Sequence, residues 1–299
     1  MISDNMNQNQ INEEESFIDN IKSDSGAFYR YAKKFSKSNN GIGPLKDVDG
    51  NICSDDTDMA RILLNQYRSV FSVPVQEIQE QRKYSVEDMP DIFFNEENIM
   101  KYIKKLNASS SSGPDGVPSK CYKYGGIMIC DALIDIYNQM WSEGYSPEKS
   151  RQAWISPTWK GSDKLIPSSY RPIALTNHFS KIFESIIREQ ILNHLTLNNL
   201  YDSAQHGSQS NKSTTSQLLE QMDTILEMLS NGTNVDIIFL DYAKAYDKVD
   251  QKLLLSKMYN MGIRGKNLKI ISHWLCDRVQ RVKVGSSLSE WDPVISGIP

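Results

Sequence analysis

Two aspartates near residue 240 are the first candidates for chemistry in this sequence. The stretch NVDIIFLDYAKAYDKVD (234–250) runs from an apolar segment directly into Asp241, and Asp247 follows six residues later. The apolar residues at 235 and 237–240 predict a strand buried on at least one face, with Asp241 at its carboxyl end. A carboxylate held there by a rigid element suits Mg²⁺, which takes oxygen ligands. The ordinary alternative is a surface acid at a strand end or a helix N-cap.

Asp247 has a different setting. The segment YDKVDQKLLLSKM (246–258) predicts a helix, so Asp247 or Asp250 is expected to cap it or to lie in its first turn. Residue 243 is alanine, which argues against the Asp-x-Asp pair of a haloacid-dehalogenase-type phosphatase. A Mg²⁺ phosphatase therefore stays open only as an alternative that rests on Asp241 alone.

The elements that must position these acids mix helices with strand ribbons. This order, without a regular strand–helix alternation, favours an α+β fold. Apolar residues at helical spacing predict helices over residues 26–38, 58–70, 95–106, 127–144, 178–195 and 214–229. Residues 155–177 predict a two-stranded ribbon, and residues 279–299 predict a hairpin that turns at Gly285-Ser286.

Turn and cap signals mark where these elements end. Asp49-Gly50 predicts a hairpin tip, and the Gly-Pro-Asp-Gly sequence at 113–116 predicts a stiff turn. Thr214 and Gln217 predict a capping box at the start of the 214–229 helix. The 26–38 helix mixes aromatic and basic residues, so it is first an amphipathic helix that docks on the body and second a nucleic-acid contact.

Composition indicates a globular, intracellular protein, in the cytoplasm or nucleus. Of the 299 residues, 39% are hydrophobic and 23% charged, and the net charge is -4. Residues 1–24 hold six acids and one base, so the remainder carries a net charge near +1, which neither favours nor excludes nucleic acid. The N-terminus is acidic and polar, unlike a targeting signal, and no apolar run suits a membrane span. The four cysteines form no Cys-x-x-Cys pair, so neither a disulfide framework nor a structural metal is expected.

Several ordered motifs give the sequence a family resemblance. The string from Phe239 to Val249, FLDYAKAYDKV, resembles the first catalytic motif of reverse transcriptases from non-LTR (LINE-type) retrotransposons. Four further segments are similar to family motifs in the right order: SSSSGPDGVPSKCYK (109–123), PTWKGSDKLIPSSYRPIALTNHFSKIFESII (157–187), QHGSQSNKSTTSQLL (205–219) and SGIP (296–299). With the stretch at 41–71 that resembles the region before the polymerase, the resemblance covers roughly residues 26–299, and motifs in order are more specific than one alone.

The resemblance implies a right-hand polymerase fold with fingers, an incomplete palm (an antiparallel sheet backed by helices) and no thumb. We expect a disordered acidic tail at 1–25, an N-terminal extension at 26–96, the fingers at 97–215 and a partial palm at 216–299. The implied reaction is RNA-directed DNA synthesis, which adds dNTPs to a DNA primer on an RNA template with Mg²⁺. No membrane partner is implied.

The resemblance also assigns roles to single residues. Asp241 is expected to be the catalytic carboxylate and a metal ligand, and the backbone carbonyl of Tyr242 is expected to be a further ligand. Tyr246 matches the aromatic residue that excludes a 2′-hydroxyl, and Gly297 matches a position where the backbone approaches the nascent base pair. Without the motif, Tyr246 would be an ordinary core tyrosine.

Three basic residues are expected to contact substrates. Lys160 and Arg171 match the cations that bind the incoming triphosphate, and Lys212 is expected to contact the template or primer. Solvated ribbon charges are the ordinary alternative for Lys160 and Arg171.

Two departures from the family pattern bear on activity. Ser208 and Gln209 stand where the family has Phe and Arg, which removes an aromatic group and a cation from the 205–219 loop. The Tyr-x-Asp-Asp motif is not among the residues, and Asp55-Asp56 lies too early to replace it. We therefore expect this chain alone to be inactive; the alternative is a non-catalytic nucleic-acid-binding remnant that uses the fingers cations and the 26–38 helix.

Overall fold

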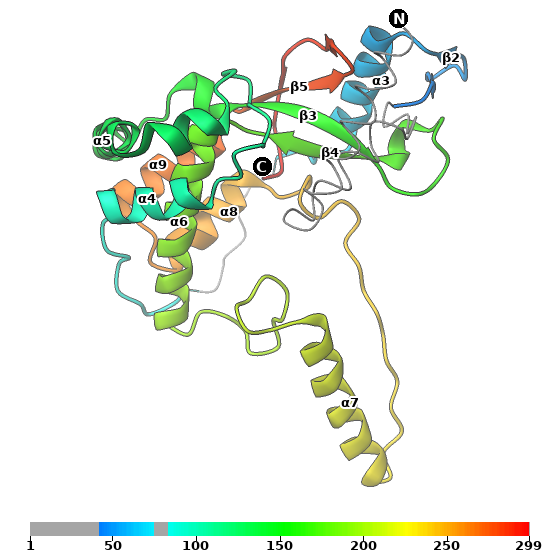
Figure 1. Ribbon diagram of the computed structural model, residues 1–299. Coiled ribbons are helices and arrows are strands. Elements are labelled where there is room, and N and C mark those ends of the chain that lie inside the picture. Colours follow the sequence, from blue (N-terminus) through cyan, green and yellow to red (C-terminus); the bar gives the residue numbers. More distant parts are fainter. Residues whose placement is uncertain (1–41, 75–82, 299) are drawn as a thin grey trace, which may run out of the picture.

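The computed structural model describes residues 42–74 and 83–298, and Figure 1 shows their arrangement. The elements are, in chain order, β1 (Leu45–Lys46), β2 (Ile52–Cys53), α3 (Asp56–Arg68), α4 (Glu96–Lys105), α5 (Ser119–Glu143), η1 (Glu148–Arg151), β3 (Gln152–Trp159), η2 (Pro167–Ser169), β4 (Tyr170–Leu175), α6 (His178–Leu197), α7 (Thr214–Ser230), α8 (Gln251–Asn260), α9 (Gly265–Leu275), β5 (Val279–Val284), β6 (Ser287–Leu288) and β7 (Asp292–Pro293). The expected tail at 1–25 and helix at 26–38 lie outside the described residues.

The main sheet has the strand order β4-β3-β5-β6, with β7 also paired to β5. β3 and β4 are antiparallel, which confirms the ribbon predicted at 155–177, and β5 and β6 form the predicted hairpin. β3 and β5 run parallel, with Trp154 opposite Arg281. The fold is therefore α+β with a mixed sheet, and the expectation of an antiparallel sheet is wrong for it. A parallel pair needs a crossover, which α6 to α9 supply here.

Two apolar clusters hold the body together. In the larger one α4, α5, α6 and α9 pack around Phe94, Tyr137 and Phe183, whose ring centroids lie 5.2–5.3 Å apart. In the smaller one α3 packs on one face of the sheet, with Leu63 against Val282 and its neighbours. The helices α4, α5, α6 and α9 thus lie on one side of the body, and the sheet covered by α3 lies on the other (Figure 1).

A buried asparagine joins α9 to α5 and to the chain before α4. Asn267 is 1% exposed, and its Oδ1 accepts a hydrogen bond from Trp141 Nε1 at 3.0 Å. Its Nδ2 donates to the carbonyls of Met89 and Pro90 at 3.2 and 2.9 Å. A buried amide is favourable only when its donors and acceptors are used, and here both ends are.

The segment expected to form the central strand is not a strand in this structure. Residues 234–240 are extended but lie in no described sheet, and Ile238, Phe239 and Leu240 are more than 80% exposed. α7, just before it, extends away from the body (Figure 1), and none of its residues is buried. The prediction of a buried strand is therefore wrong here, because a strand needs a neighbour for its backbone N–H and C=O groups.

The local signals agree better with the structure, with one shift. The turn at Asp49-Gly50 joins β1 to β2 as predicted, and Gly116 N donates to Gly113 O at 3.0 Å within the predicted turn. The capping box of α7 forms one residue earlier than predicted, between Ser213 and Ser216. The helices predicted at 58–70, 95–106, 127–144, 178–195 and 214–229 correspond to α3, α4, α5, α6 and α7.

No helix of the described residues is long and apolar enough to cross a membrane.

The first prediction concerns the aromatic cluster. Phe183 is 1% exposed, so Phe183→Ala removes a fully buried ring and leaves a cavity, which should lower the free energy of unfolding by about 3–5 kcal/mol. Urea unfolding followed by circular dichroism measures this. Phe93→Ala is the matched control, because Phe93 is 68% exposed, and a change below ~1 kcal/mol is expected there. Equal losses in the two variants would contradict the assignment of the core.

The second prediction concerns pH. Burial raises the pKa of Glu184 to about 7, although the charge of Arg278 and a 3.2 Å hydrogen bond from Trp274 Nε1 oppose this. The folded state thus binds more protons than the unfolded state between the ordinary pKa near 4.5 and about 7. Stability should fall as pH rises through this window, by up to about 3 kcal/mol.

Glu184→Gln removes this titration, so urea unfolding at pH 5 and pH 8 should show a flatter pH dependence than the parent. Glu189→Gln on the same helix is the control. Hydrogen bonds from Lys101 and Tyr102 lower the pKa of Glu189, so its contribution is lost only as pH falls below the ordinary range. A Glu184→Gln variant with the parent's slope would contradict the assignment.

Candidate functional site

A cleft of about 590 Å³ lies where the β3–β4 ribbon meets residues 241–247. Its lining consists of Lys160, Arg171, Pro172, Ile173 and residues 241–247. Lys160 directly follows β3, and its backbone N–H donates to Ser169 O at 2.8 Å. Arg171 lies in β4 opposite Thr158 of β3. Both cations therefore lie near the same end of the ribbon and line the cleft.

The opposite wall is an irregular segment that carries the sequence-predicted acid. Asp241, Tyr242 and Tyr246 all line the cleft, and the two tyrosine side chains are 86% and 70% exposed. Lys244 has a φ of +56°, in the left-handed region, and its carbonyl accepts from Lys248 N at 3.1 Å. The segment thus turns sharply and presents Asp241 and Tyr246 to the same space as Lys160 and Arg171.

The SGIP segment holds this wall in place. Gly297 N donates to Val249 O at 2.8 Å, and Ile298 N donates to Tyr246 O at 3.2 Å. Gly297 has a φ of +88°, and a Cβ there would lie 2.9 Å from Tyr246 O. Only glycine meets both demands, so the close backbone approach expected of Gly297 is made to the chain itself at Tyr246 and Asp247.

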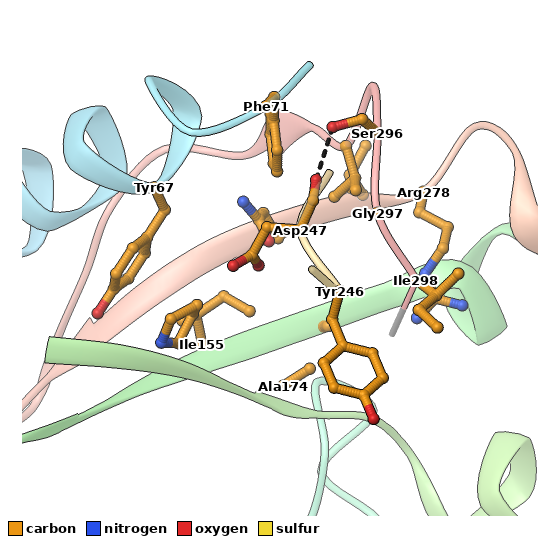
Figure 2. Close-up of a pocket in the computed structure, with 15 residues that line it drawn as sticks. Tyr67, Phe71, Ile155, Ala174, Tyr246, Asp247, Arg278, Ser296, Gly297 and Ile298 are labelled. Atoms are coloured by element: carbon orange, nitrogen blue, oxygen red, sulfur yellow. Dashed lines mark hydrogen bonds between the residues drawn. The ribbon is translucent and has the colours of Figure 1, made fainter. Parts of the chain in front are cut away.

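Ser296 completes the contact from the other side. Its hydroxyl donates to Asp247 O at 2.7 Å, which Figure 2 shows as a dashed line, and it accepts from Ser72 N at 3.0 Å. Ser72 Oγ in turn donates to Lys248 O at 3.1 Å. The loop after α3, the wall of the cleft and the SGIP segment therefore meet in one junction.

A smaller cavity of about 250 Å³ lies beside the cleft and shares Tyr246 and Asp247 with it (Figure 2). Burial raises the pKa of Asp247, and Lys244 opposes that shift. Burial and the charge of Asp247 also raise the pKa of Tyr67, which lines the same cavity. Asp250, not Asp247, caps α8, since its side chain accepts from Leu253 N at 2.8 Å. The prediction that Asp247 or Asp250 caps this helix or lies in its first turn is therefore confirmed for Asp250, whereas Asp247 lies before the cap.

Arg278, the other charged residue that lines this cavity, was not predicted from the sequence. Arg278 is 4% exposed, and burial lowers its pKa. Its two terminal nitrogens have no hydrogen-bond partner within the described part of the chain. The spacing rules that located Asp241 concern acids at element ends, so they could not single out an arginine that directly precedes a strand.

Lys212 lies apart from the cleft. Its ammonium donates a hydrogen bond to the carbonyl of Ser203, within the loop that precedes α7. The structure therefore brings together Lys160, Arg171, Asp241, Tyr242 and Tyr246, places Gly297 behind them, and leaves Lys212 elsewhere.

The cleft offers some, but not all, of the oxygen ligands that one hard cation needs. Within residues 42–74 and 83–298, no three His, Cys, Asp or Glu residues are grouped to hold a metal ion. Asp241 and the carbonyl of Tyr242 offer oxygen ligands, and Mg²⁺ often takes only one or two carboxylates and completes its shell with water and substrate phosphates.

Comparisons with known proteins show which proteins the chain is similar to. Residues 158–299 match the family model described as reverse transcriptase (RNA-dependent DNA polymerase). The chain is 27% identical, over 68% of its length, to a probable RNA-directed DNA polymerase from transposon BS of Drosophila melanogaster. It is 24% identical, over 86% of its length, to a probable RNA-directed DNA polymerase from transposon X-element of the same fly.

A putative 115 kDa protein in the fly's type-1 retrotransposable element R1DM is 24% identical over 76% of the chain. The chain spans 22%, 29% and 21% of the lengths of these three relatives. The matched family region begins at Thr158, so it includes both cations of the ribbon, the acidic wall of the cleft and the SGIP segment. The chain thus contains a reverse transcriptase domain, distantly related to those of the non-LTR retrotransposons BS, X-element and R1.

Proposed function

We propose that the cleft binds the triphosphate of an incoming dNTP together with Mg²⁺. The chain would supply the fingers (97–215) and part of the palm (216–299) of an RNA-directed DNA polymerase that extends a DNA primer on an RNA template. The observation that carries this proposal is the convergence of Lys160, Arg171, Asp241 and Tyr246 on one cleft. Residues 26–96 would form an extension before the polymerase.

The charges of the cleft fit a metal-bound triphosphate. Two cations on the ribbon face the polyphosphate, where charge-assisted hydrogen bonds from Arg and Lys are strong. Asp241 and the Tyr242 carbonyl would hold Mg²⁺, which screens the phosphates and orients them. Cations on one wall and a metal-binding acid on the other are the complement of a triphosphate that carries its own Mg²⁺.

Tyr246 and Gly297 would define the sugar and base end of the site. Tyr246, labelled in Figure 2, lines both the cleft and the smaller cavity, and it is 70% exposed. A ring in that position would sit under the deoxyribose and leave no room for a 2′-hydroxyl. Gly297 fixes the backbone of Tyr246, so its part would be to position that ring. Lys212, in the loop before α7, would contact template or primer.

The small number of carboxylates in the cleft favours binding without polymerisation by this chain alone. The cleft lining includes two acids, Asp241 and Asp247, and the second is half-buried with a raised pKa. Two-metal nucleotidyl transfer needs carboxylates that hold both ions about 4 Å apart. We therefore propose that this chain binds nucleotide and nucleic acid but does not polymerise alone. A nucleic-acid-binding role without catalysis is the second candidate, and the small number of acids in the cleft lining favours it as well.

The third prediction tests the ribbon cations. Lys160→Ala and Arg171→Ala should each weaken binding of Mg²⁺–dTTP about tenfold, because each removes a charge-assisted contact to phosphate. Isothermal titration calorimetry measures the affinity. Lys164→Ala is the matched control, because Lys164 is on the same ribbon with its ammonium 4.8 Å from the Trp159 ring centroid and does not line the cleft. Equal affinities of all three variants and the parent would refute the proposal.

The fourth prediction concerns Asp241. Asp241→Asn should remove the gain in dTTP affinity that Mg²⁺ gives the parent, while Asp236→Asn, an exposed acid outside the cleft, should retain it. The same titration with and without Mg²⁺ measures this. Primer extension on an RNA template by the parent chain should be undetectable, and extension that Asp241→Asn abolishes would contradict the proposed lack of activity.

A further inference from the structure

The cavity of about 250 Å³ beside the cleft contains a buried cation whose terminal nitrogens have no acceptor. Arg278 directly precedes β5, lines this cavity and is 4% exposed. Its Nη1 and Nη2 atoms are buried without a hydrogen-bond partner among the described residues. Buried polar groups are nearly always hydrogen-bonded, and an unpaired buried charge costs more free energy than an unpaired neutral group. A ligand that supplies acceptors to these two nitrogens would therefore be stabilised in the cavity.

The neighbours of Arg278 do not supply those acceptors. The guanidinium lies 5.3 Å from the ring centroid of Trp274, which offers it a flat aromatic face. The charge of Glu184 acts on Arg278, yet no hydrogen bond joins Glu184 to its terminal nitrogens within residues 42–74 and 83–298. Glu184 instead accepts a hydrogen bond from Trp274 Nε1 at 3.2 Å. The indole thus packs on the guanidinium and leaves its terminal N–H groups available to a ligand.

Asp247, the acid that lines the same cavity, is not the partner of Arg278. In the view of Figure 2 its carboxylate lies on the side of Tyr67, whereas the guanidinium lies on the side of Ile298. Burial raises the pKa of Asp247, and the charge that opposes this shift is that of Lys244 and not that of Arg278. The cavity therefore has a basic end and a separate acidic end.

Apolar side chains make up much of the wall between the two ends. Phe71, Ile155, Val279 and Val294 are among the residues that line the cavity. Apolar walls favour a hydrocarbon body over a strongly hydrated ion such as phosphate, because the ion would lose its water without replacement. Tyr246 lines both this cavity and the cleft, and its side chain is exposed, so the cleft offers a route into the cavity past this ring.

We propose that this cavity binds a small monocarboxylate with an apolar body, whose carboxylate accepts two hydrogen bonds from Arg278. The two terminal nitrogens of a guanidinium match the two oxygens of a carboxylate, and such charge-assisted pairs are stronger than neutral hydrogen bonds. The apolar body would contact Phe71 and Ile155, out of water. Asp247 would disfavour a second anionic group on the ligand. The inference is independent of the proposed dNTP site, because the cations of that site do not line this cavity.

The test uses benzoate as the probe and measures its affinity for the chain by saturation-transfer difference NMR at neutral pH. The buffer contains no other carboxylate and no phosphate. Benzamide is the matched ligand, because it has the same ring and no charge. The parent should bind benzoate about tenfold more tightly than benzamide, since only the carboxylate forms a charge-assisted pair with the guanidinium.

Arg278→Met should weaken benzoate binding about tenfold and leave benzamide binding within about twofold of the parent. Arg281→Met is the matched control variant. Arg281 lies in β5 with its guanidinium 4.4 Å from the ring centroid of Trp291, so it also packs on an indole, but it does not line the cavity. Its affinity for benzoate should stay within about twofold of the parent. Thermal unfolding by circular dichroism verifies that both variants are folded.

Asp247→Asn gives a second measurement that keeps Arg278 in place. It removes the acid at the far end of the cavity, so benzoate should bind about two- to fivefold more tightly than to the parent. This variant decides the matter if Arg278→Met does not fold, and an affinity no higher than the parent's would then overturn the proposal. A parent that binds no benzoate, or binds it no more tightly than benzamide, also overturns it. So does a folded Arg278→Met variant with the parent's affinity for benzoate.

Discussion

The hydroxyl of Ser296 holds together the part of the molecule on which the candidate site depends. It accepts from Ser72 N and donates to Asp247 O, and Ser296 itself is 1% exposed. Through it the chain after α3, the wall of the cleft and the SGIP segment after β7 are tied together. Residues 234–245 have no sheet of their own, so this junction is what fixes Tyr246 beside the ribbon. The hydrogen bonds of Ser296 with Ser72 and Asp247 thus position this segment, which was expected to be held by strand pairing.

The charged residues of this region divide into two sets with opposite environments. Lys160, Arg171 and Asp241 are exposed at the cleft, so water screens them and they are free to bind a charged ligand. Asp247, Arg278 and Glu184 lie deeper, and burial shifts the pKa of each toward the neutral form. Moving a charge out of water costs free energy unless it is paired, so burial of the inner set opposes folding, whereas the outer set stays hydrated. Exposed charges thus line the cleft, and buried charges that lower the stability of the fold lie beneath it.

Much of the fold follows from local pattern, and the site follows from motifs more than from pattern. Two strand-like segments around a polar turn predicted the β3–β4 ribbon, one face of which packs on α3, and helical spacing predicted α4 and α6, which are each packed on one side. Residues 235–240 show the same local signal, yet they are exposed, because burial of a strand depends on a neighbour that no local pattern supplies. Lys160 and Asp241 are 81 residues apart in the sequence, and the prediction that they share a site came from the family resemblance and not from spacing. Contacts such as Asn267 with Trp141 or Ser296 with Ser72 depend on the packed tertiary structure, so sequence reasoning had no means to find them.

The exposed apolar run at residues 237–240 also bears on self-association of the chain. Four large apolar side chains stand there without a charge or a proline, and the backbone N–H and C=O groups are in no described sheet. Such a segment pairs readily with an identical segment of a second molecule, since each offers the other both backbone partners and a matching apolar surface. The neighbouring apolar residues of α7, which are exposed as well, enlarge that surface. We therefore expect self-association of the purified chain to start from residues 237–240 and not from the well-packed helical body.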